Sequence, residues 1–280
     1  MKINIAKSAG FCFGVKRALN IALDTAKSHS RVYMLGDIVH NEDVVRDIEK
    51  RGIKKVKRLS KGKNRILLIR AHGASNSTIN KAHRIGYKVI DATCPMVKEI
   101  HRIAHSMEAK GYKIIIIGDS KHDEVRGIIG QLKNKALVID RPESIKLSAI
   151  RKLKKASVIV QSTQNIDNAA RILKILKLYI KDLKFFNTIC RPTQIKQGEI
   201  KNMPKKNDVM IIIGSKNSAN TKRLYEISKS LNSRSYWISR KDEIKKSWFS
   251  GTKTVGVTAG ASTPDSTTND VVTALRTFYY

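Results

Sequence analysis

The sequence has no long apolar run and few residues that break regular structure. Over 280 residues, no stretch reaches the length and apolarity of an ordinary membrane-spanning helix. Five prolines and sixteen glycines are too few for a fibrous or low-complexity protein. The start, MKINIAKSAG, has neither the apolar core nor the cleavage site of a secretory signal. We therefore expect a soluble cytoplasmic protein, and the length alone indicates about two domains.

Acidic residues are scarce relative to basic ones. The chain has 55 lysines and arginines against 23 acidic residues, a formal net charge of +32. Such a charge attracts nucleic acid, phosphorylated metabolites or acidic partner proteins. Compositional drift of the surface explains it equally well, because the basic residues are dispersed. The densest basic runs, 54–63 and 201–206, contain no aromatic residues for base stacking, which disfavours nucleic acid as a partner.

Only three cysteines occur, Cys12, Cys94 and Cys190, and none belongs to a C-x-x-C motif. Their odd number and wide spacing argue against a disulfide framework, and the missing motif excludes a small zinc knuckle. Two interpretations remain open at this point. The cysteines are three unrelated buried thiols, or they are the ligands of one metal centre.

Each cysteine directly precedes a segment with the pattern of a helix. These segments are residues 13–28, 95–110 and 191–203. Pro95 suits the first position of the second helix, whereas Gly198 predicts that the third helix is weak and interrupted. The N-terminus of a helix offers free N–H groups and a partial positive charge, which stabilise a thiolate. Three thiolates placed in this way can hold one soft metal centre.

Five apolar, β-branched runs end abruptly in short polar segments. They are residues 66–75, 113–127, 158–165, 208–220 and 254–263. Helical patterns lie between them, for example over 167–182 and 220–231. Buried strands that alternate with helices predict the α/β class with parallel sheets. Ligands of such sheets bind beyond the carboxyl ends of the strands.

The polar segments at these strand ends carry hydroxyl, amide and imidazole side chains. The set comprises His72, His122, Glu124, Ser162, Thr163, Ser218, Asn220 and Ser262. Together with backbone N–H groups, such side chains can surround a phosphate or a diphosphate. No P-loop motif occurs, and no G-x-G-x-x-G follows a strand, so the sequence indicates neither a P-loop nucleotide nor a dinucleotide. Glu124 lies two residues from His122, where its carboxylate can reach a reacting group.

Several short motifs occur in an order that resembles one known family. They are GFCFGVKRAL (10–19), IVHN (38–41), AHG (71–73), DATCPMV (91–97), HDEVRG (122–127), QST (161–163), NTIC (187–190), GSKNSAN (214–220) and TAGASTPD (258–265). In this combination the chain resembles the 4-hydroxy-3-methylbut-2-enyl diphosphate reductase family of the non-mevalonate isoprenoid route. The resemblance covers essentially the whole chain.

The resemblance implies three similar α/β domains in a trefoil-like arrangement around a central cavity. We expect them over residues 13–94, over 95–186, and over 187–280 together with 1–12. It also implies one 4Fe–4S cluster per chain, held by Cys12, Cys94 and Cys190, with the fourth iron free of protein ligands. An open iron of this kind can bind the substrate's hydroxyl as a Lewis acid.

The resemblance further implies the activity and the roles of the polar residues. The reaction is the reductive dehydroxylation of 4-hydroxy-3-methylbut-2-enyl diphosphate to isopentenyl and dimethylallyl diphosphate. The substrate-binding residues are then His40, His72, His122, Ser162, Thr163, Ser218, Asn220 and Ser262. Glu124, Ser162 and His122 carry the catalytic roles, with Glu124 as the source of protons. The net positive charge suits an acidic electron donor, a ferredoxin or a flavodoxin.

The chain departs from the family pattern at a few positions, and other functions remain open. Ala219 replaces a serine, Lys196 stands where arginine is common, and Asp123 stands where proline is common. An alternative is a basic nucleic-acid-associated protein, or a degenerate cluster-binding protein without reductase activity. A zinc hydrolase is disfavoured, because catalytic zinc rarely takes three thiolates and no H-E-x-x-H motif occurs.

Overall fold

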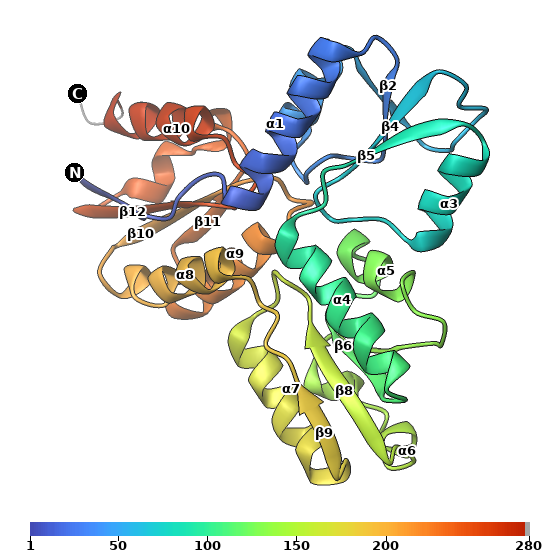
Figure 1. Cartoon of the computed structure of the whole chain (residues 1–280). Coiled ribbons are helices and arrows are strands. Elements are labelled where there is room, and N and C mark those ends of the chain that lie inside the picture. Colours follow the sequence, from blue (N-terminus) through green and yellow to red (C-terminus); the bar gives the residue numbers. More distant parts are fainter. Residues whose placement is uncertain (278–280) are drawn as a thin grey trace. The chain divides into compact units, whose positions relative to one another are not determined.

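A computed structural model describes residues 1–277 of the chain. Its strands form three four-stranded sheets, with helices between most consecutive strands (Figure 1). Every strand pairs in parallel with its neighbours. The predicted α/β class is therefore confirmed. Among the described residues, no helix has both the length and the apolarity needed to cross a membrane.

The first sheet has the strand order β3-β2-β4-β5. Its strands are β2 (Val32–Leu35), β3 (Ile53–Val56), β4 (Arg65–Ile69) and β5 (Tyr87–Asp91). The helices along this part of the chain are α1 (Phe13–Ser28), α2 (Glu42–Lys50) and α3 (Asn76–Arg84). Ser75 caps α3 by accepting the N–H of Thr78 on its hydroxyl, which satisfies one of the free donors of the first turn.

The second sheet repeats this arrangement with the order β7-β6-β8-β9. Its strands are β6 (Lys113–Ile117), β7 (Leu137–Ile139), β8 (Lys155–Val160) and β9 (Asp182–Phe185). Its helices are α4 (Pro95–Ala109), α5 (Asp123–Ile129), the 3₁₀ turn η1 (Pro142–Ser144), α6 (Leu147–Ile150) and α7 (Ile166–Tyr179). As predicted, Pro95 is the first residue of α4.

The third sheet has the order β1-β12-β10-β11 and is completed by the N-terminal strand. Its strands are β1 (Lys2–Ile5), β10 (Val209–Ile213), β11 (Ser235–Ile238) and β12 (Thr254–Ala259). The associated helices are α8 (Arg191–Ile200), η2 (Met203–Lys205), α9 (Ala219–Leu231), η3 (Lys241–Glu243), η4 (Lys246–Phe249) and α10 (Asp265–Thr277). With β1 counted last, all three sheets share one strand order.

The central strands are buried on both faces, which explains their continuous apolar sequences. In β6, Ile115 and Ile117 belong to one buried cluster, whereas Ile114 and Ile116 belong to another. Successive side chains of a strand point to opposite faces, so a single run of isoleucines supplies two cores. Strand β10 does the same in the third sheet, where Met210 and Ile212 form a cluster separate from that of Ile211.

The expected interruption of the third cysteine-linked helix is wrong. Helix α8 runs without a break from Arg191 to Ile200 and includes Gly198. Gly198 is exposed, so its missing side chain leaves no cavity in the core. The cost of a mid-helix glycine, about 1 kcal/mol, is offset because the opposite face of α8 is buried.

The chain forms two compact units. Unit 1 comprises Met1–Val15, His40–Val44 and Arg191–Tyr280, and unit 2 comprises Lys16–Val39 and Val45–Cys190. Unit 1 contains the third sheet, and unit 2 contains the first and second sheets. Each of the three predicted domains contains one sheet. The division into three domains and the trefoil arrangement stay predictions, and residues 278–280 of the last domain lie outside the described residues.

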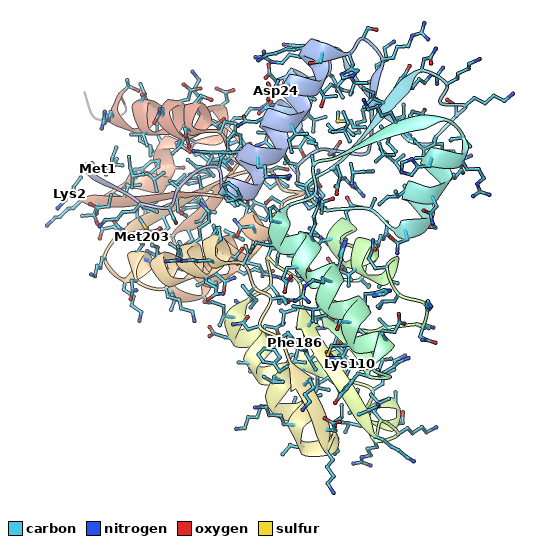
Figure 2. All side chains as sticks on the ribbon, viewed as in Figure 1. Met1, Lys2, Asp24, Lys110, Phe186 and Met203 are labelled. Carbon is cyan, nitrogen blue, oxygen red and sulfur yellow. The ribbon has the colours of Figure 1, made fainter. Side chains whose placement is uncertain are left out.

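Basic side chains are dispersed along the whole chain. Side chains that end in nitrogen project from helices and strands throughout, as at the exposed Lys2 and Lys110 (Figure 2). Several are engaged locally, for example Arg102, which forms an ion pair with Glu99 one turn earlier on α4. The dispersal is typical of a chain whose surface is basic overall.

Candidate active site

All three cysteines directly precede a helix, as the sequence predicts. Cys12 precedes α1, Cys94 precedes α4 and Cys190 precedes α8. Within residues 1–277 the three cysteines form no disulfide, and each is partly exposed. Each cysteine therefore lies at the N-terminus of a helix, where the first backbone N–H groups have no intrahelical partners.

The backbone holds the three cysteines in equivalent positions of the three sheets. Each cysteine follows the edge strand of its sheet, and its N–H donates to a carbonyl in the loop after the neighbouring strand. The pairs are Cys12 with Ala261 (3.1 Å), Cys94 with Ala71 (3.0 Å) and Cys190 with Ser162 (3.0 Å). Each acceptor lies two residues beyond the end of its strand. One local structure thus occurs three times, which is evidence against three unrelated thiols.

Further contacts in unit 2 fix the loop that carries Cys94. The carboxylate of Asp91 accepts both the N–H of Thr93 (2.9 Å) and its hydroxyl (2.5 Å). The guanidinium of Arg17 donates to the carbonyl of Thr93 (3.1 Å). The sequence did not indicate this contact of Arg17, which lies on α1. Asp91 and Thr93 belong to the motif DATCPMV.

Glu124 is a buried carboxyl group paired with Ser162. Its side chain is 1% exposed. One carboxyl oxygen accepts the N–H of Ser162 and the other accepts its hydroxyl, both at 2.6 Å. Burial raises the pKa of Glu124 above its ordinary value of 4.5, and the two hydrogen bonds from Ser162 oppose this shift in part. A carboxyl group with a raised pKa can keep a proton and deliver it to a reacting group.

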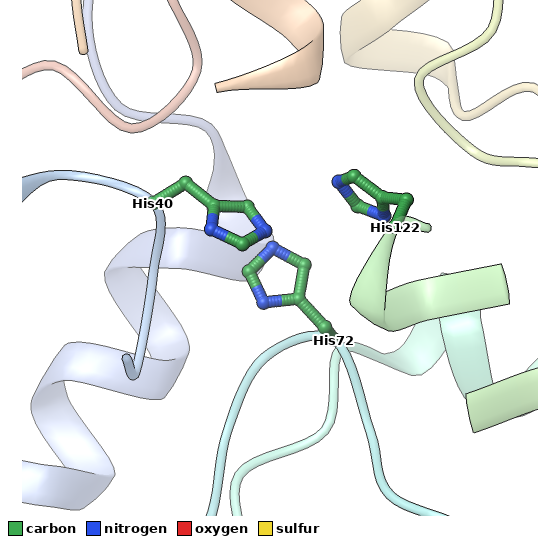
Figure 3. Close-up of side chains that lie close together, drawn as sticks. All are labelled: His40, His72 and His122. Atoms are coloured by element: carbon green, nitrogen blue, oxygen red, sulfur yellow. The ribbon is translucent and has the colours of Figure 1, made fainter. Parts of the chain in front are cut away.

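Helix α5 begins where it does because of His122, which is its N-cap. The Nδ1 atom of His122 accepts the N–H of Glu124 (3.2 Å), so that the ring nitrogen replaces the usual oxygen acceptor. This bond requires Nδ1 to carry no proton. The His122 ring meets the His72 ring edge to face, with centroids 5.6 Å apart, and each ring offers a nitrogen within 4.8 Å of the other (Figure 3).

An ion pair joins the two loops that carry these histidines. The guanidinium of Arg70 donates to the carboxylate of Asp123 at 2.7 Å. Arg70 lies two residues before His72, and Asp123 lies between His122 and Glu124. The aspartate that departs from the family pattern therefore has a structural role in unit 2, because it tethers the start of α5 to the end of β4.

Thr163 lies beside Gln161, which sequence reasoning missed as a site residue. The Nε2 group of Gln161 donates to the Thr163 hydroxyl (3.1 Å), and its Oε1 accepts the N–H of Asp119 (3.0 Å). Gln161 thereby links the polar loops after β6 and β8. The sequence did contain an indication of its role, since Gln161 is the first residue of the motif QST.

In unit 1, His40 and Ser262 are held together through their backbones. The Ser262 hydroxyl donates to the carbonyl of His40 (3.0 Å), and the amide of Asn41 donates to the carbonyl of Ser262 (2.8 Å). The Asn41 oxygen also accepts the N–H groups of Asp43 and Val44 at the start of α2. Asn41 belongs to the motif IVHN, but the motif did not indicate that Asn41 fixes this loop.

Ser218 and Asn220 lie at the start of α9 in unit 1. Ser218 is the N-cap and accepts the N–H of Thr221 (3.3 Å). Asn220 is 4% exposed. Within residues 1–277, neither polar atom of its side chain has a hydrogen-bond partner. Buried amide groups are normally hydrogen-bonded, so the unpaired side chain of Asn220 is an exception among the described residues.

The predicted site residues divide between the two units. Unit 1 holds Cys12, His40, Ser218, Asn220 and Ser262, and unit 2 holds Cys94, Cys190, His72, His122, Glu124, Ser162 and Thr163. Within unit 2 the structure brings Glu124 to Ser162 and His122 to His72. Within unit 1 it brings His40 to Ser262.

His101 packs beneath the turn that carries His72. The left-handed φ of Gly73, 77°, requires a glycine there, and a Cβ atom on it would lie 2.9 Å from the His101 ring. The Nε2 atom of His101 is buried without a hydrogen-bond partner among the described residues. Burial lowers the pKa of His101 to about 4, against a weaker opposing effect of Asp91.

We expect this shift to make folding stability depend on pH. The unfolded chain protonates His101 below pH 6.5, whereas the folded chain does so only below about pH 4. The free energy of unfolding should therefore fall by up to about 3 kcal/mol as the pH falls through this window. Urea unfolding of His101→Gln should lose this contribution, and His105→Gln, an exposed change one turn along α4, should keep it. Equal pH profiles for all three proteins would contradict the assignment.

Three parallel sheets, each with a cysteine between its edge strand and a helix, define a three-cysteine α/β protein with the donor set of a soft metal centre. Residues 3–276 match the family described as LytB protein. The chain belongs to the LytB protein family. Membership in this family implies an iron–sulfur cluster, and three partly exposed thiols at helix N-termini suit one.

Curated relatives and solved structures agree with this assignment. Proteins named 4-hydroxy-3-methylbut-2-enyl diphosphate reductase match along nearly their whole length. The one from Geobacter metallireducens is 38% identical over 276 residues, 99% of this chain and 97% of its own. The one from Aquifex aeolicus is 39% identical over 267 residues, 94% and 92% of the two chains.

Two solved structures are also similar. The first is described as (E)-4-hydroxy-3-methyl-but-2-enyl diphosphate reductase, the terminal enzyme of the non-mevalonate pathway. It has a TM-score of 0.72 and 38% identity, and the match covers 99% of this chain and all of that one. The second is the E-1-hydroxy-2-methyl-but-2-enyl-4-diphosphate reductase from Plasmodium falciparum. It has a TM-score of 0.90 and 27% identity, and the match covers 98% and 87% of the two chains.

Proposed function

We propose that this protein is a 4-hydroxy-3-methylbut-2-enyl diphosphate reductase. The reaction takes up two electrons and two protons, breaks the carbon–oxygen bond of the allylic alcohol and releases water. The products are isopentenyl and dimethylallyl diphosphate, according to the carbon that receives the second proton. Family membership supports the activity. The observation that carries it is the buried Glu124 paired with Ser162, in the same unit as two of the cysteines.

Cys12, Cys94 and Cys190 would hold a single 4Fe–4S cluster with one iron free of protein ligands. The support is their equivalent placement in the three sheets and the helix that begins directly after each of them. When bound, the cluster supplies electrons and a Lewis-acidic iron for the alcohol oxygen. The protein's part is to present three sulfur donors and leave the fourth position to the substrate.

Glu124 is the proton donor in this proposal, and Ser162 orients it. Both carboxyl oxygens bond to Ser162, so the group has one defined position instead of rotating freely. In this proposal the Ser162 hydroxyl, 2.6 Å from the Glu124 carboxyl group, passes a proton between that group and the substrate's alcohol. His122 contributes by anchoring the first turn of α5, because its ring accepts the N–H of Glu124.

The substrate's diphosphate binds to polar side chains of the predicted site in this proposal. We assign it to His40, His72, His122, Thr163, Ser218, Asn220 and Ser262. Imidazole, hydroxyl and amide groups donate hydrogen bonds to a multiply charged anion, and such bonds are stronger than those between neutral groups. The unsatisfied side chain of Asn220 supports its place in this set.

Replacement of Asn220 by alanine should separate binding from folding. No hydrogen bond of the described protein is lost, so the melting temperature of Asn220→Ala should not fall. The diphosphate loses a charge-assisted bond, and KM should rise about tenfold or more. Steady-state kinetics and thermal unfolding check this, with Asn217→Ala, an exposed amide just before α9, as the control for KM. A lowered melting temperature with unchanged KM would refute the role of Asn220.

We place the protein in the cytoplasm with an acidic ferredoxin or flavodoxin as electron donor. A net charge of +32 supports an acidic protein partner, since opposite charges accelerate encounter. We also propose three domains, residues 13–94, 95–186, and 187–280 with 1–12, each built on one sheet and each supplying one cysteine.

The function is tested by anaerobic purification, cluster reconstitution and assay. Iron and acid-labile sulfide should approach four of each per chain, with absorption in the visible range from the cluster. Dithionite with a redox mediator should then convert the allylic alcohol diphosphate into the two products. A colourless protein after reconstitution, or an iron-loaded protein without turnover, would reject the reductase. Nucleic-acid affinity that falls steeply with salt and is unaffected by Cys94→Ser would favour the alternative named above.

A further inference from the structure

The loop before Cys12 is fastened by a buried lysine. Lys196, on the inner face of α8, is 2% exposed. Its ammonium group donates to the carbonyls of Gly10 (3.1 Å) and Ala259 (3.0 Å), and also to that of Ser8. A buried ammonium group is costly unless all its donors are used, and here three carbonyl oxygens take them. The lysine therefore ties the loop to the end of β12.

Glu199, one turn further along α8, accepts hydrogen bonds from the same loop. Its carboxylate accepts the N–H of Ser8 (3.1 Å) and the Ser8 hydroxyl. Residues three apart on a helix lie on one side, so Lys196 and Glu199 act together on the loop. Between them they bind all three polar groups of Ser8: its N–H, its carbonyl and its hydroxyl.

The other end of the loop is fixed by the backbone. The N–H of Cys12 donates to the carbonyl of Ala261 (3.1 Å). Gly10 has a φ of 95°, and a Cβ atom on it would lie 2.2 Å from an oxygen of Asp265. The loop from Ser8 to Cys12 is thus held at both ends, and only the α8 contacts depend on long side chains.

We propose that Lys196 and Glu199 are positioning residues that set the location of the Cys12 thiolate as a cluster ligand. The inference rests on the proposed function, because it takes Cys12 to be an iron ligand. Helix α8 begins directly after Cys190. One helix therefore follows one ligand and fixes the loop of another, so that Cys12 is ordered before the cluster binds.

Hydrogen exchange of the full-length, cluster-free protein tests the positioning role. In Lys196→Met the loop loses its charge-assisted bonds, and amides 8–12 should exchange about tenfold faster or more. Lys196→Arg should restore slow exchange, because arginine also carries several donors. The matched control is Lys205→Met, which removes an exposed charge in the same unit. Amides of β6, in unit 2, should exchange as in the native protein throughout.

Iron content after reconstitution provides the second readout. We expect less iron per chain and a weaker visible spectrum in Lys196→Met, with recovery in Lys196→Arg. If Lys196→Met does not fold, Glu199→Ala tests the same loop with the loss of a single partly exposed side chain. Unchanged exchange of the loop in these variants would overturn the proposal. So would equal acceleration over all of unit 1, because that would indicate general destabilisation.

These outcomes are separable from failure of the proposed function. The exchange measurement needs neither cluster nor substrate. If the native protein does not bind iron, the proposed reductase function is rejected, and with it the role of Cys12 as a ligand. If the native protein binds iron and Lys196→Met keeps both slow exchange of the loop and full iron content, only the positioning role is rejected.

Discussion

Glu124→Gln is expected to abolish turnover while it leaves the fold and the cluster in place. Glutamine keeps the shape of the side chain, and its oxygen can still accept the N–H of Ser162 while its NH₂ group donates to the Ser162 hydroxyl. It cannot give up a proton at neutral pH. The loss of a general acid typically costs about 10²- to 10⁴-fold in rate, and we expect kcat to fall by that amount. Single-turnover and steady-state kinetics measure it.

The pH dependence gives a second readout of the same residue. Because burial raises the pKa of Glu124, the folded protein keeps its proton to a higher pH than the unfolded chain does. Its contribution to the free energy of unfolding is present below pH 4.5 and is lost as the pH rises through the raised pKa. A proton donor obeys the same titration, so kcat should decline as the pH rises through that pKa.

The controls distinguish a proton donor from a general structural role. Glu49→Gln removes an exposed carboxylate on α2 and should change neither kcat nor the pH profile. In Glu124→Gln the dependence of unfolding on this titration should vanish, and iron content should equal that of the native protein. A Glu124→Gln enzyme that turns over at the native rate would disprove the role, whatever its stability.

Replacement of any one cysteine by serine should remove or destabilise the cluster. A serine hydroxyl is a harder donor than a thiolate and stays protonated at neutral pH, so it is a poor ligand for iron. Loss of residues that merely support a metal ligand typically costs about 10- to 100-fold, and we expect the loss of a ligand to cost at least the upper value in activity. Iron and sulfide analysis, with the visible spectrum, measures the effect at positions 12, 94 and 190.

Met96→Ser is the matched control for Cys94→Ser. It removes a sulfur atom from an exposed side chain two residues away on the first turn of α4, but it removes no thiolate. Iron content and activity should be unchanged. Retention of full iron and activity in all three cysteine variants would contradict the cluster assignment altogether.

The sequence predicted the interior strands better than the edge strands. Five apolar runs correspond to β4, β6, β8, β10 and β12, because these strands are buried on both faces. The edge strand β3, with the sequence IKKV, has two exposed lysines at its centre, and β9 ends in two exposed residues. Strands that face solvent need no continuous apolar run, so hydrophobicity alone did not reveal them.

The start of each cysteine-linked helix was also predictable, because it is set by neighbouring residues. Pro95 at the first position of α4 is an example in which local chemistry decides the boundary. The length of α8 was not predictable, because Gly198 weakens the helical pattern of the local sequence. Its buried face, which includes Lys196 and Ile200, is known only from the packed structure.

The amino-acid sequence by itself determined the α/β class, the helix after each cysteine and the identity of the candidate ligands, because these depend on short-range pattern and residue type. Only the tertiary structure decided which polar groups meet. Glu124 and Ser162 are 38 residues apart, and Lys196 and Ser8 are 188 apart. Such pairs form because parallel strands bring the loops at their carboxyl ends to one edge of a sheet, and because a helix packed there can bury a charge. The sequence marked Lys196 only as a departure from the family pattern, and its burial is known only from the packed structure.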